Sequence, residues 1–169
     1  MAEQFLTLMA DLDEAAQSRM GEWYSALRDA GFSGTQTPGL PYHISLTTYP
    51  PSMEREAIAR MEKAAADFSP FPVYISHIGI FPGGKVLFGA PEKNKKLTAL
   101  HDACDSGAPQ PYPWTPHATL LMDTPETVCA AVPVLVRSFS PFTATITRLH
   151  LCAFWPTREI ASLPLNGRK

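Results

Sequence analysis

The 169-residue sequence lacks the features that mark several specialised classes of protein. It has three cysteines, an odd number at wide spacing with no CxxC pair, so neither a disulfide framework nor a closed zinc site is expected. We expect Cys104, Cys129 and Cys152 to be buried, reduced thiols. No stretch approaches the roughly eighteen apolar residues that a membrane span requires, and the acidic N-terminal segment is not typical of a signal peptide. These absences predict a cytoplasmic protein without a membrane partner.

An excess of positive charge is also missing. The 14 Lys and Arg residues are outnumbered by 16 Asp and Glu residues, which gives a formal net charge of -2 at pH 7. A nucleic-acid backbone is held mainly by Lys and Arg, so this composition argues against a broad nucleic-acid surface. It still allows a single nucleotide or a short RNA to bind in a cleft, where phosphate recognition is local.

What the chain does contain is typical of one folded domain. Hydrophobic residues make up 45% of the sequence and charged residues 18%, which is the balance of a globular protein and not of a disordered one. A length of 169 residues is enough for one core but not for two ordinary domains. We expect a single domain over residues 1–169.

Hydrophobic patterning predicts both helices and strands. Helices are expected to begin at the capping box Asp11-x-x-Glu14, near Pro51, near Pro91 and near Pro125. Within the last of these, Pro133 predicts a kink or a break, at a cost of roughly 3 kcal/mol. The predicted strands cover residues 5–9, 42–48, 72–81, 85–90, 117–122, 142–155 and 159–165.

The order of these elements repeats. Each half of the chain, approximately 1–84 and 85–169, is predicted to run strand, helix, strand, helix, strand, although the two halves share little sequence. Two such lobes around one core would be related by a pseudo-twofold axis. The third element of each half would then lie beside its counterpart across a cleft.

Those two strands carry similar motifs. One is "PYHISLTTYP" (residues 41–50) and the other is "TPHATLLMDT" (residues 115–124). Residues i and i+2 of a strand face the same side, so His43 projects with Ser45, and His117 projects with Thr119. Each strand therefore has one polar face and one apolar face. An unsatisfied buried polar group costs about 1 to 3 kcal/mol, and two such faces could satisfy each other around an anion.

Two histidines suit phosphoryl transfer without a metal. One neutral imidazole can remove a proton from an attacking water or hydroxyl, while one protonated imidazole donates a proton to the departing oxygen. An unperturbed pKa of about 6.5 lets both forms exist near neutral pH. The two hydroxyls would hold the non-bridging phosphate oxygens. Either motif alone is a loose pattern, and only the pair indicates this chemistry.

The paired HISL and HATL motifs resemble the two H-x-[ST]-hydrophobic motifs of the 2H phosphoesterase superfamily, which includes LigT-type 2'-5' RNA ligases and cyclic nucleotide phosphodiesterases. The resemblance covers nearly the whole chain. It implies a bilobal α+β fold of two pseudo-twofold-related antiparallel sheets with outer helices and a central cleft. It also implies catalytic roles for His43 and His117 and phosphate-binding roles for Ser45 and Thr119. At Thr115, many members carry an arginine instead.

The function implied by the resemblance is hydrolysis, or reversible ligation, of 2',3'-cyclic phosphate or 2'-5' phosphodiester bonds in nucleotides or short RNA. No cofactor and no obligate protein partner are expected. Aromatic residues beside the motifs could stack on a base, although packing would explain them equally well. Four residues are possible substrate contacts: Tyr49, Tyr112, Trp114 and Arg148.

Two alternatives stay open. The first is a nucleotide- or RNA-binding module that keeps the cleft without turnover. The second is a metallohydrolase in which His77 and His150 join the two motif histidines and a cysteine around a metal. The sequence contains no HExxH or CxxC spacing, and a metal would leave the paired hydroxyls unexplained.

Overall fold

The structure is a computed structural model that describes residues 4–109 and 113–167. Over these residues the chain forms seven strands, four α-helices and a short 3-10 helix. In chain order they are β1 (Phe5–Leu12), α1 (Glu14–Asp29), β2 (His43–Tyr49), η1 (Pro51–Met53), α2 (Glu54–Asp67), β3 (Phe71–Ile80), β4 (Val86–Pro91), α3 (Lys95–Cys104), β5 (Ala118–Met122), α4 (Pro125–Ser138), β6 (Phe142–Phe154) and β7 (Arg158–Pro164).

All strand pairs are antiparallel and form one hydrogen-bonded sheet in the order β2-β1-β6-β3-β4-β5, with β7 paired to β6. The predicted α+β class with outer helices is confirmed. The order is symmetric, because exchanging β1, β2 and β3 with β4, β5 and β6 reverses it and leaves it unchanged. Two pseudo-twofold-related β-α-β-α-β units would produce this order.

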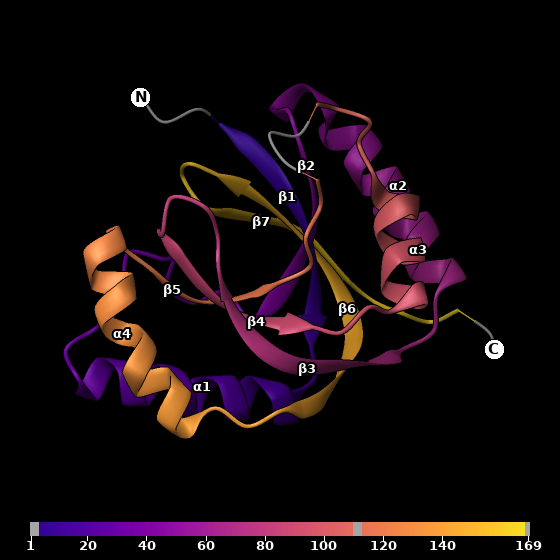
Figure 1. The fold of residues 1–169 in the computed structure, drawn as a ribbon. Coiled ribbons are helices and arrows are strands. Elements are labelled where there is room, and N and C mark those ends of the chain that lie inside the picture. Colours follow the sequence, from indigo (N-terminus) through magenta and orange to yellow (C-terminus); the bar gives the residue numbers. More distant parts are fainter. Residues whose placement is uncertain (1–3, 110–112, 168–169) are drawn as a thin grey trace.

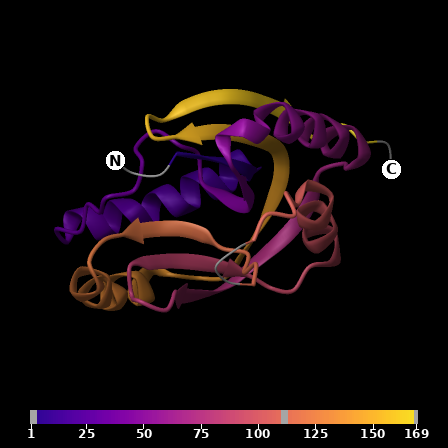
Figure 2. The same ribbon diagram turned by 90° about the horizontal axis from the view of Figure 1, so that it is seen from above.

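The two predicted sheets are parts of this one sheet, joined through β6. Residues 142–146 of β6 pair with β3, residues 146–154 pair with β1, and residues 148–153 pair with β7. We call β2, β1, β6 and β7 the first half-sheet, and β3, β4 and β5 the second half-sheet. Figure 2 shows them as two layers linked by the curved ribbon of β6. A structural repeat of 1–84 and 85–169 stays a prediction, and the half-sheets do not follow that boundary, because β6 and β7 lie beside β1.

The helices pack in two pairs. Helix α1 contacts α4, and α2 contacts α3, so each pair combines one helix from either half of the sequence (Figure 1). Helices α2 and α3 contact strands of the first half-sheet, and α4 contacts β4 of the second. Their buried faces hold the large apolar side chains Met20, Trp23, Leu27, Met61, Leu97, Leu100, Val128 and Leu135.

The sequence predicted that Asp11 caps the first helix, and this prediction is wrong. Helix α1 begins at Glu14, and its N-cap is Asp13, whose carboxylate accepts a backbone hydrogen bond from the first turn. Strand β1 runs on to Leu12, which is buried in the core. This extension places Asp11 opposite His43 on the neighbouring strand β2.

The predicted break at Pro133 is also absent, because α4 is one helix from Pro125 to Ser138. A proline inside a helix leaves the carbonyl four residues earlier without its partner. Here that residue is Cys129, which is exposed, so water can satisfy the carbonyl. The buried residues Val128 and Leu135 pack α4 onto the protein and offset the cost of the proline.

Cys104 and Cys152 are buried, as predicted, but Cys129 is exposed. The prediction for Cys129 was wrong because it rested on the usual burial of cysteine. The buried residues of α4 are Val128, Ala131 and Leu135, and Cys129 is not among them. None of the helices formed by residues 4–109 and 113–167 is long and apolar enough to cross a membrane.

Candidate active site

The first histidine motif stands at the start of β2. Nδ1 of His43 lies 2.7 Å from the carbonyl oxygen of Pro41. A carbonyl can only accept a hydrogen bond, so the proton of the neutral imidazole is held on Nδ1, and Nε2 is left as the reactive nitrogen. The side chain of Gln17 on α1 holds the preceding backbone, since it both donates to the carbonyl of Tyr42 and accepts from its N–H.

The second motif repeats this geometry just before β5. Nδ1 of His117 lies 2.8 Å from the carbonyl oxygen of Thr115, again two residues earlier in the chain. The same argument leaves Nε2 as the reactive nitrogen of His117. Both histidines thus present the same ring nitrogen, although they come from opposite ends of the sheet order.

A β-bulge follows at the same position of each motif. Leu46 in β2 and Leu120 in β5 are the extra residues that have no partner in the neighbouring strand. Their side chains are 0% and 1% exposed, so each is an anchor in the core. The bulge ends simple alternation directly after the histidine and hydroxyl pair.

The hydroxyls of the two motifs are open to a ligand. Ser45 and Thr119 are both partly buried. Over residues 4–109 and 113–167, neither side-chain hydroxyl has a hydrogen-bond partner. A hydroxyl that is half-shielded from water and unpaired can donate to an anion.

The two motifs lie near each other. Strand β2 contacts β5, and the indole Nε1 of Trp114, from the segment leading to the second motif, donates a hydrogen bond of 2.9 Å to the carbonyl of Ser45. The histidines also interact through charge, because the protonated form of His117 is one cause that lowers the pKa of His43.

The surroundings of His43 are charged. Burial lowers the pKa of His43, and charge on His117 and His150 lowers it further. The carbonyl of Pro41 and the carboxylate of Asp11 act in the opposite direction and raise it. Asp11 is therefore the nearby negative charge that favours a protonated His43.

The surroundings of His117 are aromatic. Its ring centroid lies 4.6 Å from that of Phe81, at an interplanar angle of 90°, and 5.3 Å from that of Phe88. A Cβ at Gly79 would come within 2.5 Å of the Phe88 ring, so the absence of a side chain there lets that ring lie across β3. Burial lowers the pKa of His117, and the hydrogen bond to Thr115 opposes the shift.

A polar cluster that the sequence did not reveal lies beside His43, with Asp11 and His150 buried and Glu159 exposed. Nδ1 of His150 is 3.5 Å from Oδ2 of Asp11, and its Nε2 is 3.1 Å from Oε2 of Glu159. The Asp11 carboxylate raises the pKa of His150, and Glu159 adds to this, against the effect of burial. The signal for Asp11 is present in the sequence, since Thr7, Met9 and Asp11 alternate with leucines and alanine, but Asp11 also fits the pattern of a helix cap.

Tyr49, predicted as a possible substrate contact, lies in the core. Simple alternation would place it on the side of His43, but the bulge at Leu46 reverses the faces, and Tyr49 pairs with Leu6. It is 1% exposed, and its hydroxyl donates a hydrogen bond to the carbonyl of Cys104. Burial raises the pKa of the Tyr49 hydroxyl, which keeps it protonated as a donor.

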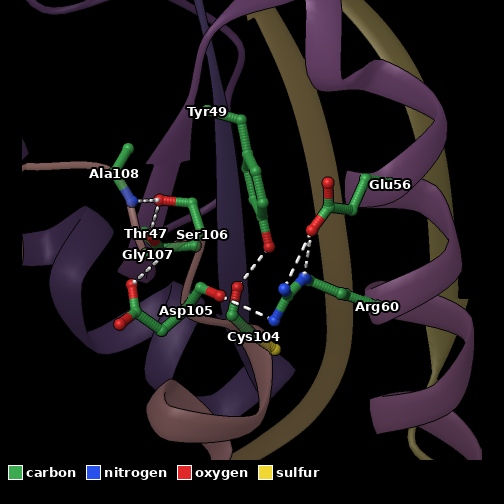
Figure 3. A network of polar contacts seen from close by, with 9 residues as sticks. All are labelled: Thr47, Tyr49, Glu56, Arg60, Cys104, Asp105, Ser106, Gly107 and Ala108. Carbon is green, nitrogen blue, oxygen red and sulfur yellow. Dashed lines mark hydrogen bonds and ion pairs between the residues drawn. The ribbon is translucent and has the colours of Figure 1, made fainter.

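Figure 3 shows what Tyr49 helps to hold. Its ring points toward the end of α3, where Arg60 of α2 donates to the carbonyl of Asp105 at 2.8 Å and pairs with Glu56 at 2.8 Å. Tyr49 and Arg60 therefore bind consecutive carbonyls of one chain segment. Together they fasten the C-terminal end of α3 to β2 and α2.

The other predicted substrate contacts have different outcomes. Trp114 is partly buried and stacks on His101, with ring centroids 4.0 Å apart. Arg148 is on β6 in register with Asp11, and its Nη1 donates to Oγ of Ser162 at 3.2 Å. Tyr112 lies outside the described residues. Substrate contacts by Trp114 and Arg148 stay predictions.

The metal hypothesis gains no support from the arrangement of side chains. Over the described part of the chain, no group of three or more His, Cys, Asp or Glu side chains is placed so that it could hold a metal ion. His77, one of the proposed ligands, instead lies on the surface of β3, where Nδ1 contacts Oγ of Ser76 at 2.9 Å.

Comparison with known proteins gives a family for this chain. The family model described as the 2'-5' RNA ligase superfamily matches residues 12–154. The match therefore includes both histidine motifs. No curated protein matches the chain by sequence.

Solved structures share the fold. E. coli LigT, in a crystal structure with 3'-AMP, superposes with a TM-score of 0.66 at 19% sequence identity, over 96% of this chain and 98% of that one. TT0787 of Thermus thermophilus gives a TM-score of 0.69 at 16% identity, over 98% and 100% of the two chains. The LigT-like fold expected from the sequence is confirmed.

The role assigned to Tyr49 can be tested by removing only its hydroxyl. Tyr49→Phe leaves the buried carbonyl of Cys104 without its donor, so we expect the free energy of unfolding to fall by about 1 to 3 kcal/mol. Denaturant unfolding measures this, with Tyr74→Phe as the matched control, because Tyr74 is 47% exposed. Equal stability of the two variants would contradict the structural role.

The ion pair of His150 and Asp11 predicts a pH-dependent contribution to stability. A folded-state pKa that is raised gives stability below the unfolded pKa, and this stability is lost as the pH rises through the folded value. The stability difference between the wild type and His150→Gln should therefore be larger near about pH 6 than near about pH 8.5. Thermal or denaturant unfolding at both pH values measures the difference, and a constant difference would contradict it.

Proposed function

The chain belongs to the 2'-5' RNA ligase superfamily of 2H phosphoesterases, and on this basis we propose that it hydrolyses 2',3'-cyclic phosphates of nucleotides or short RNA. In this proposal His43 and His117 are the general acid and base, Ser45 and Thr119 bind the phosphate, and no metal takes part. The observation that carries it is the identical presentation of two imidazoles, each with Nδ1 tied to a carbonyl and Nε2 left for the reaction.

The chemistry needs one proton to enter and one to leave. The neutral imidazole takes a proton from water through Nε2, and the water oxygen forms a bond to phosphorus. The bond from phosphorus to one ribose oxygen breaks, and that oxygen receives the proton of the charged imidazole. The product is a phosphate monoester with a free ribose hydroxyl. The two histidines end with their protonation states exchanged, and proton exchange with water restores them.

The hydroxyls of Ser45 and Thr119 would hold the non-bridging oxygens. Each stands two residues after its histidine, ahead of a leucine that is fixed in the core. Donors set in rigid strands need little reorganisation when charge develops on phosphorus-bound oxygens. A bound phosphate also favours the protonated form of a neighbouring histidine, which supplies the acid.

Hydrolysis is favoured over ligation of long partners. With a formal net charge of -2, the protein has little positive surface to grip two RNA strands. The related E. coli LigT has been crystallised with 3'-AMP and with phosphate, which are ligands of the size that a local site accepts. Cleavage of 2'-5' linkages, or ligation in reverse, would use the same groups.

The first test is turnover of 2',3'-cyclic AMP and its three counterparts in the presence of EDTA. His43→Ala and His117→Ala should each lower kcat by roughly 10²- to 10⁴-fold, the usual loss when a general acid or base is removed. His77→Ala is the control, because its side chain is 58% exposed on β3 and should leave kcat unchanged.

The outcomes separate the alternatives. Loss of activity in EDTA would overturn the metal-free mechanism. Nucleotide binding without turnover by the wild type would favour a binding module. Unchanged kcat in both motif variants would exclude His43 and His117 as acid and base.

The pH dependence gives a second test. One histidine must be protonated and the other neutral, and the pKa of each lies below the usual value of about 6.5 in the free protein. The reactive fraction therefore increases as the pH falls toward these pKa values, so kcat/KM should rise from about pH 8 to about pH 6. Initial rates at constant ionic strength measure the profile. A rise toward alkaline pH would contradict the assignment.

A further inference from the structure

A hollow of about 380 Å³ lies beside His43, on the first half-sheet. Strands β1, β6 and β7 and the segment 38–41 enclose it. Two of its lining residues are also neighbours of His43. Asp11 is the partner of His43 in the β1-β2 pairing, and Pro41 supplies the carbonyl that holds the imidazole. Adjacent strands are about 4.8 Å apart, so the hollow begins one strand away from the proposed catalytic group.

One side of the hollow is apolar. It consists of Pro38, Leu40 and Pro41. Leu40 is anchored, because it packs on the small buried cluster of Met9, Cys152 and Phe154. The side chains of this wall are apolar, which suits the face of a planar ring.

The other side is rich in acceptors. It carries the carboxylates of Asp11 and Glu159 and the hydroxyl of Ser162. The imidazole of His150 stands between the two carboxylates, 3.5 Å from Oδ2 of Asp11 and 3.1 Å from Oε2 of Glu159. The two carboxylates that flank this imidazole attract N–H or O–H donors, while the Ser162 hydroxyl already accepts from Nη1 of Arg148 at 3.2 Å.

One of these acceptors, on Asp11, has no hydrogen-bond donor within the described residues. Asp11 is 7% exposed and His150 is 5% exposed. Over the described parts of the chain, Oδ1 of Asp11 has no hydrogen-bond partner, while its Oδ2 faces Nδ1 of His150 at the ion-pair distance of 3.5 Å. Buried carboxylate oxygens are normally paired, because leaving one unpaired forfeits its hydration. The unpaired oxygen of Asp11, a residue that lines the hollow, therefore calls for a donor, which a ligand would supply.

The chemistry of the proposed substrate identifies that donor. In a 2',3'-cyclic phosphate both ribose hydroxyls are esterified, so apart from the 5' hydroxyl the donors that remain belong to the base. Guanine, adenine and cytosine carry an exocyclic amino group, which a carboxylate accepts from readily. Uracil has no amino group, and its one N–H donor, at N3, lies between two carbonyls that the carboxylates would repel.

We propose that this hollow is the nucleobase subsite of the enzyme, and that Asp11 selects bases with an exocyclic amino group over uracil. This rests on the proposed function, since the cyclic phosphate at His43 and Ser45 fixes where the base lies. The apolar segment 38–41 covers the ring face. The carboxylate of Asp11 accepts from the amino group, while His150 holds its other oxygen.

The experiment compares kcat/KM of the wild type for the 2',3'-cyclic phosphates of guanosine, adenosine, cytidine and uridine. We expect uridine to be the poorest substrate, by about tenfold or more, because a hydrogen bond to a charged acceptor is lost. Asp11→Asn keeps the shape of the side chain and presents an amide donor to a carbonyl. It should reduce the discrimination against uridine by about tenfold.

Asp102→Asn is the matched control. It makes the same chemical change at an exposed carboxylate on α3, far in the sequence from the hollow, and should leave the preference unchanged. Asp11→Asn also alters the charge beside His43, which changes all four rates in common. The ratio of the rates is therefore the readout. Glu159→Gln and Ser162→Ala on β7 test the same subsite if Asp11→Asn does not fold.

The outcomes separate the subsite from the reaction. Equal turnover of all four substrates by the wild type, or an equal loss for all four in Asp11→Asn, would overturn the subsite and leave the proposed function standing. Absence of any turnover would overturn the function. Calorimetric binding of the four 2'-nucleoside monophosphates would then decide the subsite, with a preference against uridine supporting it and equal or absent binding overturning it.

Discussion

The site depends on one constraint of the backbone, the β-bulge that follows each histidine motif. Up to the bulge, strand alternation places a histidine and a hydroxyl on one face; at the bulge, Leu46 or Leu120 enters the core and the alternation restarts. The polar pair is therefore confined to the first residues of the strand. The buried leucine behind it fixes the strand's rotation, and the hydrogen bond from Nδ1 to a carbonyl fixes the imidazole.

This local geometry is repeated, but its surroundings are not. His43 lies near Asp11 and His150, whereas His117 lies against Phe81 and Phe88. Burial lowers the pKa of both histidines, yet only His43 has a carboxylate that opposes the shift. A symmetric pair of rings in asymmetric surroundings is what acid-base catalysis requires, because the two groups must hold different protonation states at one pH.

The sequence was informative where a pattern has one physical meaning. Alternation and helical stripes predicted the strands and the order of elements, and the two motifs predicted which strands come together. Prediction from the sequence failed where two local rules compete. Asp11 satisfies the pattern of a helix cap, but the apolar alternation of β1 extends past it. Tyr49 was misplaced because a bulge cannot be seen in residue spacing, and Pro133 because packing outweighed propensity.

The charge of the site leads to a coupling between ligand and proton. At Thr115 the chain has no arginine to neutralise a phosphate, and Arg148 is directed to Ser162 on β7. In the proposed site the imidazoles must then supply much of the positive charge themselves. Burial disfavours that charge in the free protein, while a bound phosphate favours it. By linkage, phosphate binding and protonation would strengthen each other, so the proposed acid would be charged when substrate is present, and the free site would avoid two positive rings.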